Sequence, residues 1–335
     1  MNKKVAFICP LYDMKNHFDL AFNLYKSKID LGITEELIFV FSDNIQKEKF
    51  RKRIKDSFNI EIAYLILPQE ELHFKSKVTV KKIYALRSLM YDYDYLALVD
   101  SESIFIKKEN FYELFEEIWD TGTFLNCNIS PDGFFIQRDC FRTLSKKIYN
   151  NKIIRSEFDD FRYNLWFNEI PVYKCSTLPS FMKWLDSFDK NGWMNKWNCF
   201  DYYMYVAYLV LYENKHLIKH PDIISNGGVM EYLFERPISE QVDIINKLGT
   251  HWSSNKCAIN DNICMLFHLD REKGEGKYSF ALDQDKMKEF DEERNMLLRR
   301  DALVDKYPVM TLLFKVKEVY YKMKRKLFSP RRIHF

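Results

Sequence analysis

Four short apolar runs, separated by segments with helical spacing, occupy the first hundred residues of this chain. The runs are Val5–Cys9, Glu36–Phe41, Ile60–Leu67 and Tyr95–Val99. Their length is that of β-strands covered on both faces, and it is short for buried helices. Strands that alternate with helices build parallel βαβ units. The pattern therefore predicts an α/β fold with a doubly wound sheet, whose ligands bind beyond the carboxyl ends of the strands.

Apolar spacing and turn residues place the other expected elements. Asp132-Gly133 reads as a turn between two paired strands, and residues 183–198 are rich in Trp, Asn and Asp but show little periodicity. We expect helices at 16–30, 45–58, 78–90, 111–119 and 200–212, short strands at 103–106, 124–128, 134–137 and 265–268, and a charged helical region from Lys286 onward.

Length and composition indicate one large domain with an appendage. The chain has 335 residues, 47% of them hydrophobic, which supplies an ample core. Glycine and proline number nine each, so long disordered linkers are not expected. We predict a catalytic domain over residues 1–280 and a helical, basic amphipathic extension over residues 281–335.

The charge of the chain is concentrated in its C-terminal tail. The net charge is +3, yet residues 315–335 alone carry eight Lys or Arg and one acid. The rest is therefore slightly acidic, and no nucleic-acid partner is expected. Apolar and basic residues alternate from Met310 to Phe328, as in segments that lie on an anionic bilayer, where each base contributes about 1 kcal/mol. The alternative is a helix that packs on the protein itself or on a partner.

The seven cysteines and the N-terminus indicate a cytoplasmic protein. No two cysteines have C-x-x-C spacing, which excludes zinc-ribbon and thioredoxin-like sites, and scattered single cysteines suit a reducing compartment. The apolar part of Met1–Pro10 is too short for a signal peptide and reads as a first strand. We expect a cytoplasmic protein that attaches peripherally to the inner face of the plasma membrane through its tail.

An acidic motif, Asp100-Ser101-Glu102, directly follows the fourth apolar run. A buried strand thus delivers two carboxylates to the rim of the sheet, where both can face one divalent cation. Mg²⁺ and Mn²⁺ prefer oxygen ligands that they share with substrate phosphates. The alternative is an acidic loop without a ligand. The chain has neither G-x-G-x-x-G nor G-x-x-x-x-G-K-[ST], so ordinary dinucleotide and P-loop sites are not expected.

The order of a basic helix, an apolar strand and this acidic motif resembles nucleotide-sugar-dependent glycosyltransferases of the GT-A type. The residues that carry the resemblance are KIYALRSL at 82–89 and YLALVDSESIFI at 95–106, and bacterial surface-polysaccharide transferases are the most similar group. Here Glu102 stands where the D-x-D motif has its second Asp. The resemblance spans about residues 3–270. It implies a GT-A-like mixed sheet flanked by helices and a hexosyltransferase-like activity.

The resemblance also implies substrates and a metal. The donor would be a nucleotide-diphosphate sugar, with a UDP-sugar first, the acceptor a glycan or lipid-linked glycan, and the cofactor Mn²⁺ or Mg²⁺. The helix before the motif carries the basic residues Lys77, Lys81, Lys82 and Arg87. Lys82 would contact the diphosphate, and a solvated helix face is the alternative for any one of these residues. The residues expected to bind the donor are Pro10, Tyr12, Asp43, Lys82, Asp100, Ser101, Asp132, Gly133 and Lys273.

The expected metal ligands are Asp100, Glu102 and His268. In many GT-A enzymes a late histidine after a short strand completes the metal site, and a following base grips the diphosphate. His268 ends such a strand here, and Arg271 or Lys273 follows it. The alternative is a surface histidine at a strand end, and His251 is a rival that reads more simply as packed by its aromatic neighbour.

The catalytic base is expected to be Asp201, at the start of the aromatic helix. A carboxylate that deprotonates the acceptor hydroxyl would serve an inverting reaction. An Asp at this position also suits a helix cap, and Asp186 and Asp189 are alternatives. The aromatic and Asn residues of 184–205 suit stacking on sugars, and a plain aromatic core explains them as well.

Two other classes of function stay open. A sugar nucleotidyltransferase would carry a Gly-rich basic loop after the first strand, and Pro10–His17 contains no glycine. A non-catalytic membrane-peripheral protein would keep the fold without the chemistry.

Overall fold

A computed structural model describes residues 4–11, 17–101, 103–105, 108, 110–120, 126–129, 131–164, 171–219, 266–268, 284–311 and 314. The chain divides into two compact units, Met1–Asp283 and Gln284–Phe335. Among the described residues, no helix combines the length and the apolar character needed to cross a membrane.

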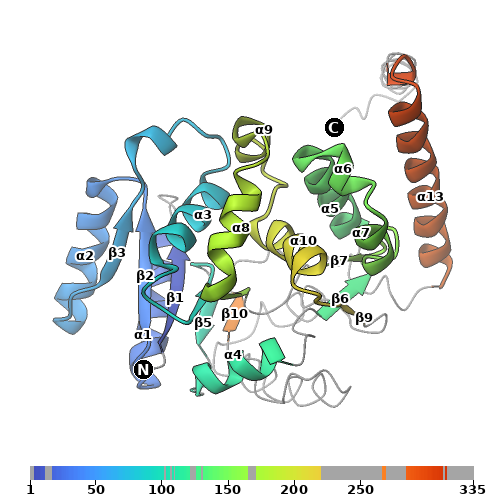
Figure 1. Cartoon of the computed structure of the whole chain (residues 1–335). Helices are drawn as coiled ribbons and strands as arrows, with labels where there is room; N and C mark the ends of the chain where they lie inside the picture. Colours follow the sequence, from blue (N-terminus) through green and yellow to red (C-terminus); the bar gives the residue numbers. More distant parts are fainter. Residues whose placement is uncertain are drawn as a thin grey trace, which may run out of the picture. The chain divides into compact units, whose positions relative to one another are not determined.

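A five-stranded mixed sheet forms the centre of the first unit, as the sequence predicts (Figure 1). Its order is β3-β2-β1-β4-β8, and the first three pairings are parallel, whereas β8 joins β4 antiparallel. The strands are β1 (Val5–Pro10), β2 (Glu36–Phe41), β3 (Ala63–Ile66), β4 (Tyr95–Leu98) and β8 (Val172–Lys174). Strand β8 has only three residues, and the sequence pattern did not predict it.

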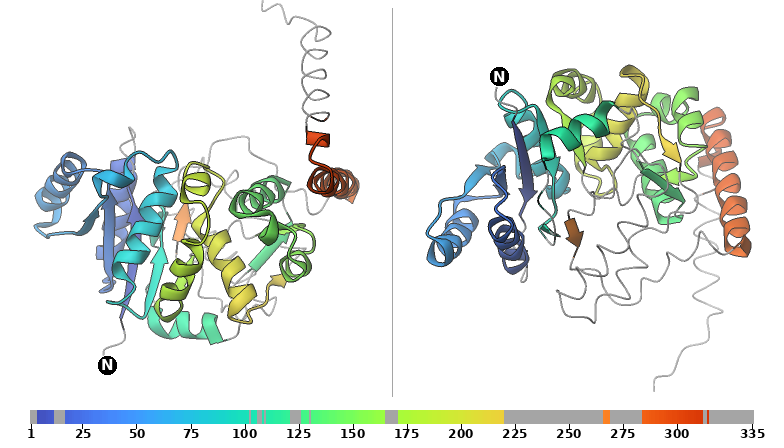
Figure 2. Two further views of the ribbon diagram at one scale, coloured as in Figure 1. Left: turned by 45° about the horizontal axis from the view of Figure 1, so that its top comes forward. Right: turned by 90° about the horizontal axis from the view of Figure 1, so that it is seen from below.

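Three crossover helices connect the parallel strands. Because the chain runs from β1 outward to β3 and then returns to β4 on the other side of β1, right-handed crossovers require α1 and α2 on one face and α3 on the other. Figure 2 shows this arrangement. The helices are α1 (His17–Asp30), α2 (Asn44–Phe58) and α3 (Lys77–Leu89).

Helices and two small sheets complete the first unit. β5 pairs antiparallel with β10, and β6 lies between β7 and β9. These strands are β5 (Ser103–Phe105), β6 (Asn126–Ile129), β7 (Tyr163–Asn164), β9 (Ile218–Lys219) and β10 (Leu266–His268). The helices are α4 (Phe111–Asp120), α5 (Pro131–Leu144), α6 (Lys146–Tyr149), α7 (Lys152–Glu157), α8 (Leu178–Leu185), α9 (Lys190–Met194) and α10 (Asp201–Tyr212).

Aromatic side chains hold the sheet against its neighbours. Phe7 of β1 is fully buried, and its ring centroid lies 5.0 Å from that of Phe105 and 4.9 Å from that of Phe111. On the side of β2, the rings of Phe39 and Phe50 lie 4.7 Å apart. These edge-on contacts bury large apolar areas. They fix β5, and with it the segment that follows Asp100, against the central sheet.

The turn predicted at Asp132-Gly133 is wrong, because these residues belong to the first turn of helix α5. Pro131 begins the helix, where its missing N–H costs nothing and its fixed φ favours a helix start. The predicted strand 134–137 is the same helix. Phe134, Gln137 and Phe141 are fully buried, and their spacing of three and four residues is helical. This spacing, read over a longer window, would have indicated the helix.

The second unit contains the helix α13 (Gln284–Lys306), which has 23 residues. At 1.5 Å per residue it is about 35 Å long. It confirms the charged helix that the sequence predicts from Lys286 onward. The basic tail, residues 315–335, lies outside the described residues, so membrane binding by the tail stays a prediction.

Candidate functional site

The motif residue Asp100 lies just beyond the carboxyl end of β4, next to the carboxyl end of β1. The Ser103 N–H donates a hydrogen bond of 3.1 Å to the Asp100 carbonyl, so residues 100–103 form a tight turn. Ser101 and Ser103 are buried, whereas the Asp100 side chain is 41% exposed. The turn therefore presents one carboxylate to solvent at the edge of the sheet where α/β proteins bind ligands.

Lys82 of α3 provides a positive charge next to this carboxylate. Its Nζ lies 3.3 Å from Asp100 Oδ1, and its side chain is only 11% exposed. The neighbouring Lys81 is almost fully buried and donates to the carbonyl oxygen of Leu11, at the end of β1. Charges with little exposure interact more strongly than charges in water. Contact of Lys82 with a diphosphate stays a prediction.

His17, the first residue of α1, contacts the motif from another direction. Its Nδ1 lies 2.8 Å from Ser101 Oγ, although the two residues are 84 positions apart in the sequence. Further along the same helix, Ser27 Oγ accepts a hydrogen bond of 2.9 Å from the Phe105 N–H. Helix α1 therefore lies alongside residues 101–105 over most of its length. Sequence reasoning missed His17, because no local pattern marks a contact that only the crossover creates.

Strand β10 brings His268 to the motif. It pairs antiparallel with β5, and the register sets His268 opposite Ser103. Paired residues of antiparallel strands have Cα atoms about 4.5–5.5 Å apart. The structure thus returns the chain, after more than 160 residues, to the immediate neighbourhood of the Asp100 turn. Ser103 Oγ is buried there and has no hydrogen-bond partner among the described residues.

These residues fit a divalent cation. The exposed Asp100 carboxylate supplies the oxygen ligand that Mg²⁺ and Mn²⁺ prefer. The register places His268 near enough in the backbone to contribute a second ligand. Within the described part of the chain, no group of three His, Cys, Asp or Glu side chains gathers to hold a metal. Glu102, the other predicted ligand, lies outside the described residues.

Comparison with solved structures gives many matches, among them two distant neighbours. No protein-family model matches the chain, and no curated protein matches it. TarS 1–349 from S. aureus, solved with UDP, is 15% identical, with 75% of this chain and 72% of that chain covered and a TM-score of 0.33. The Mn/GDP form of core-mannan synthase A from Aspergillus fumigatus is 12% identical, with 66% and 74% covered and a TM-score of 0.37.

The second neighbour is named as a mannan synthase, and the two structures hold UDP and Mn/GDP, respectively. Both TM-scores lie below 0.5, however, and both identities below 25%. The functional assignment therefore rests on this chain's own residues.

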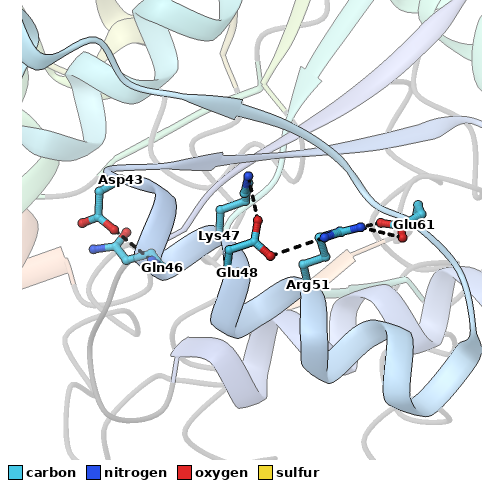
Figure 3. Close-up of polar contacts among 6 residues, drawn as sticks. All are labelled: Asp43, Gln46, Lys47, Glu48, Arg51 and Glu61. Carbon is cyan, nitrogen blue, oxygen red and sulfur yellow. Dashed lines mark hydrogen bonds and ion pairs between the residues drawn. The ribbon is translucent and has the colours of Figure 1, made fainter.

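Two predicted nucleoside-binding residues have structural contacts at the same edge of the sheet. Pro10 is buried at the end of β1, where it pairs with Val40. Asp43 caps helix α2, because its Oδ1 accepts a hydrogen bond of 2.8 Å from the Gln46 N–H (Figure 3). A capping carboxylate is held in place by the helix. Binding of the nucleoside by these two residues stays a prediction.

Figure 3 also shows why the outer part of α2 is an ordinary surface. Arg51 donates from Nε and Nη2 to the two oxygens of Glu61, at 2.6 and 2.8 Å. Its Nη1 contacts Glu48 at 3.3 Å, and Glu48 also pairs with Lys47. These charges are satisfied by one another and contribute little to stability at an exposed position. The acidic and basic residues of α2 therefore give no reason to extend the site in that direction.

Asp201 is placed differently from what a solvent-facing base requires. It lies in the first turn of α10, but the cap position is Phe200, and the Asp201 carboxylate is only 2% exposed. It accepts a hydrogen bond from the Tyr173 hydroxyl. Burial raises the pKa of Tyr173 well above its usual value, and the Asp201 charge adds to the shift. The carboxylate is thus part of a buried polar contact between β8 and α10.

The two alternative bases also have structural partners. Arg87 donates to both oxygens of Asp186, at 2.9 and 2.7 Å, which ties α3 to the end of α8. This hydrogen bonding raises the pKa of Arg87. Asp189 caps α9 through a hydrogen bond of 3.1 Å from the Asn191 N–H. Further predicted residues, Tyr12, His251, Arg271 and Lys273, lie outside the described residues.

Proposed function

We propose that this chain transfers a sugar from a nucleotide-diphosphate donor, a UDP-sugar first among them, to a hydroxyl of a glycan or lipid-linked glycan. The observation that carries the proposal is the juxtaposition at the carboxyl edge of the sheet. An exposed Asp100 carboxylate, the ammonium group of Lys82 and the end of strand β10 at His268 meet there. Carboxylate and ammonium groups at this edge suit a cation and a diphosphate.

The residues of the chain have distinct roles in this proposal. Lys82 Nζ, little exposed and held beside Asp100, contacts a donor phosphate oxygen as a point charge. The contact between His17 and Ser101 fixes the turn that carries Asp100. Lys81, which donates to the Leu11 carbonyl, holds the end of β1 against α3, where the nucleoside would lie.

A divalent metal, Mn²⁺ or Mg²⁺, would be held by Asp100, with His268 and Glu102 as the other predicted ligands. When bound, such an ion neutralises the charge that develops on the departing nucleotide diphosphate. The hydrogen bond from the Ser103 N–H to the Asp100 carbonyl closes the turn that carries this carboxylate. Lys82 adds a second positive charge on the side of α3.

For the acceptor, the proposal names only a chemical class. A lipid-linked acceptor, as in capsule or lipopolysaccharide synthesis, would suit attachment of the basic tail to an anionic membrane. The proposal includes cytoplasmic location, peripheral on the inner face of the membrane. Asp201 as the base would require the acceptor to displace the Tyr173 hydroxyl from a buried contact, so we assign no base.

The direct test measures nucleotide binding and donor hydrolysis in the full-length chain. Thermal shift with UDP, GDP and CMP, each with and without Mn²⁺, should show stabilisation by one nucleotide that EDTA reverses. Hydrolysis of the matching nucleotide sugar should fall at least about 100-fold in Asp100→Asn, as expected when a metal-holding charge is lost. Asp56→Asn removes an exposed carboxylate on α2 and serves as the control.

Two results would overturn the proposal. Full hydrolytic activity in Asp100→Asn would remove the role of the acidic motif, and no response to any nucleotide would favour a non-catalytic binding protein. Formation of a nucleotide sugar from a nucleoside triphosphate and a sugar phosphate, with release of pyrophosphate, would instead assign the chain to the sugar nucleotidyltransferases.

A further inference from the structure

Three tryptophans lie between residues 184 and 197, and they differ strongly in their exposure to solvent. Trp193 is 1% exposed, and Trp184 packs within an aromatic cluster with Phe188 and Tyr208. Trp197, in contrast, is 66% exposed. Exposing a large indole costs free energy that packing would recover. The aromatic richness of this segment is therefore mostly core, and Trp197 is the most exposed of these three rings.

Hydrogen bonds fix the segment around Trp197 against the start of helix α3. The Ser76 N–H donates to the Met194 carbonyl at 3.1 Å, and Thr79 Oγ1 donates to the Cys199 carbonyl at 3.2 Å. A third bond of 3.0 Å runs from the Lys75 N–H to Asn195 Oδ1. Figure 1 shows α9, which precedes the segment, beside the N-terminal end of α3. Trp197 is thus held by a rigid part of the fold.

The same helix connects this segment to the donor side of the site. Thr79, which holds Cys199, and Lys82, which pairs with Asp100, are three residues apart on α3. Residues at this spacing share one helix face, with Cβ atoms about 5–6 Å apart. Both side chains are buried. The Trp197 segment therefore lies about one helical turn from the Asp100 turn, along the same face of α3.

Asn198, which follows Trp197 in the sequence, carries an unsatisfied polar group. The residue is 8% exposed, and its Oδ1 is buried without a hydrogen-bond partner among the described residues. A buried amide oxygen without a hydrogen-bond partner destabilises the fold. The Asn198 side chain would have to turn toward the surface for a sugar hydroxyl to reach Oδ1, and the new hydrogen bond would then recover this cost. The adjacent Phe200 supports the indole from the side, with ring centroids 6.2 Å apart in an edge-on arrangement.

We propose that Trp197 and Asn198 form a saccharide-binding subsite at the carboxyl edge of the sheet. Its ligand would be a pyranose ring, whose apolar C–H face stacks on the indole while a hydroxyl donates to Asn198 Oδ1. An amphipathic ligand matches an aromatic face beside a polar group. The Trp197 indole lies beside the proposed site of the donor diphosphate, so we assign the bound sugar as the acceptor. This assignment rests on the proposed function.

A protein partner fits these observations less well. The residues around the ring in the sequence are polar, namely Asn195, Lys196 and Asn198. Protein interfaces instead use contiguous patches with several buried anchors. One exposed ring with one unsatisfied amide oxygen matches the size of a single sugar unit.

The test is saturation-transfer difference NMR on the full-length protein with soluble methyl glycosides. The probes are the α and β methyl glycosides of glucose, galactose, mannose and N-acetylglucosamine. At least one should receive saturation from the wild type. Trp197→Ala should weaken its binding about tenfold, as expected for the loss of one stacked aromatic contact, while Trp197→Phe should keep most of it. Tyr91→Ala, which removes another exposed aromatic ring, 77% exposed, should bind like the wild type.

The outcomes distinguish the subsite from the proposed function. No saturation of any glycoside in the wild type, or equal binding by Trp197→Ala, overturns the subsite. Nucleotide thermal shifts measured on the same proteins test the donor site separately, and Trp197→Ala should keep them. Trp197-dependent glycoside binding without any nucleotide response would leave the subsite standing and overturn the proposed transfer reaction. Asn198→Ser tests the amide contact independently of the Trp197 indole. This variant should bind the glycoside more weakly and fold like the wild type.

Discussion

Lys82 Nζ lies 3.3 Å from Asp100 Oδ1, and this ion pair joins helix α3 to the turn that follows strand β4. The lysine is nearly buried and the carboxylate is partly exposed. The pair therefore fixes the position of Asp100 from the inside while one side of the carboxylate faces solvent. A ligand that binds beside Asp100 therefore contacts an ammonium group and a carboxylate whose positions are fixed before it binds.

Replacing Lys82 with Met should weaken nucleotide binding, because the diphosphate loses a charge-assisted hydrogen bond. Such bonds contribute about 1.5–3 kcal/mol, so the Kd for UDP or GDP should rise about 10- to 100-fold in isothermal titration calorimetry. Lys52→Met, at an exposed lysine of α2, is the matched control and should leave the Kd unchanged. Equal affinities for the wild type and Lys82→Met would contradict a phosphate contact by this lysine.

His17 and Ser101 should behave as one unit in nucleotide binding. Each single change to Ala should raise the nucleotide Kd about fivefold, and the double variant should be no worse than either. The coupling free energy in this double-mutant cycle should then be about 1 kcal/mol, because both changes break the same 2.8 Å contact. His17→Asn, which places an amide near the position of Nδ1, should restore part of the affinity. Additive effects of the two changes would show that the contact does not position the turn.

Asp201 should act mainly through stability. Its carboxylate is buried against the Tyr173 hydroxyl. Asp201→Ala leaves this hydroxyl buried without its partner, so the free energy of unfolding in urea should fall by about 1–3 kcal/mol. Asp201→Asn keeps the shape, and its kcat should stay within about threefold of the wild type. A general base contributes about 100-fold or more, so a loss of that size in Asp201→Asn, at unchanged stability, would restore the catalytic assignment.

The thiol of Cys175 should make the fold sensitive to alkaline pH. Burial, with the nearby charge of Asp94 as a smaller cause, raises the pKa of this thiol from 9.0 to about 12. The folded state therefore keeps its proton at pH values where the unfolded chain has lost it. This contribution is complete below pH 9 and is lost as the pH rises from 9 to about 12.

The free energy of unfolding, measured in urea at several pH values, tests this effect. The Cys175 thiol alone should lower it by about 1.4 kcal/mol per pH unit in that window. Cys175→Ser carries no ionisable thiol, and its decline with pH should be shallower by this amount. Parallel pH profiles for the two proteins would show that the buried thiol does not contribute.

Much of the fold could be predicted because its signals are local. The strand Glu36–Phe41 and the helix that ends at Phe58 follow from a run of apolar residues and from helical spacing, each complete within fifteen residues. The parallel order of the first strands followed from the alternation of strands and helices along the chain. The acidic motif could be placed at the edge of the sheet for the same reason, since it directly follows an apolar strand.

The remaining features depend on contacts between distant segments. Strand β8 has three residues and exists because β4 offers it a free edge, and α5 was misread because Asp132-Gly133 also matches a turn. Conversely, the aromatic segment near Trp197 has the same composition whether its rings are buried or exposed. Only the packing of α8 and α10 separates Trp184 from Trp197.

The sequence by itself therefore determined the α/β class, the first four strands and the position of Asp100 at the rim of the sheet. The tertiary structure decided which groups meet that carboxylate: Lys82 among several lysines, His17 from α1, and the end of β10 at His268. The physical reason is one of range. Strand and helix signals repeat over a few residues, whereas ion pairs and register form between segments that only the folded chain brings together.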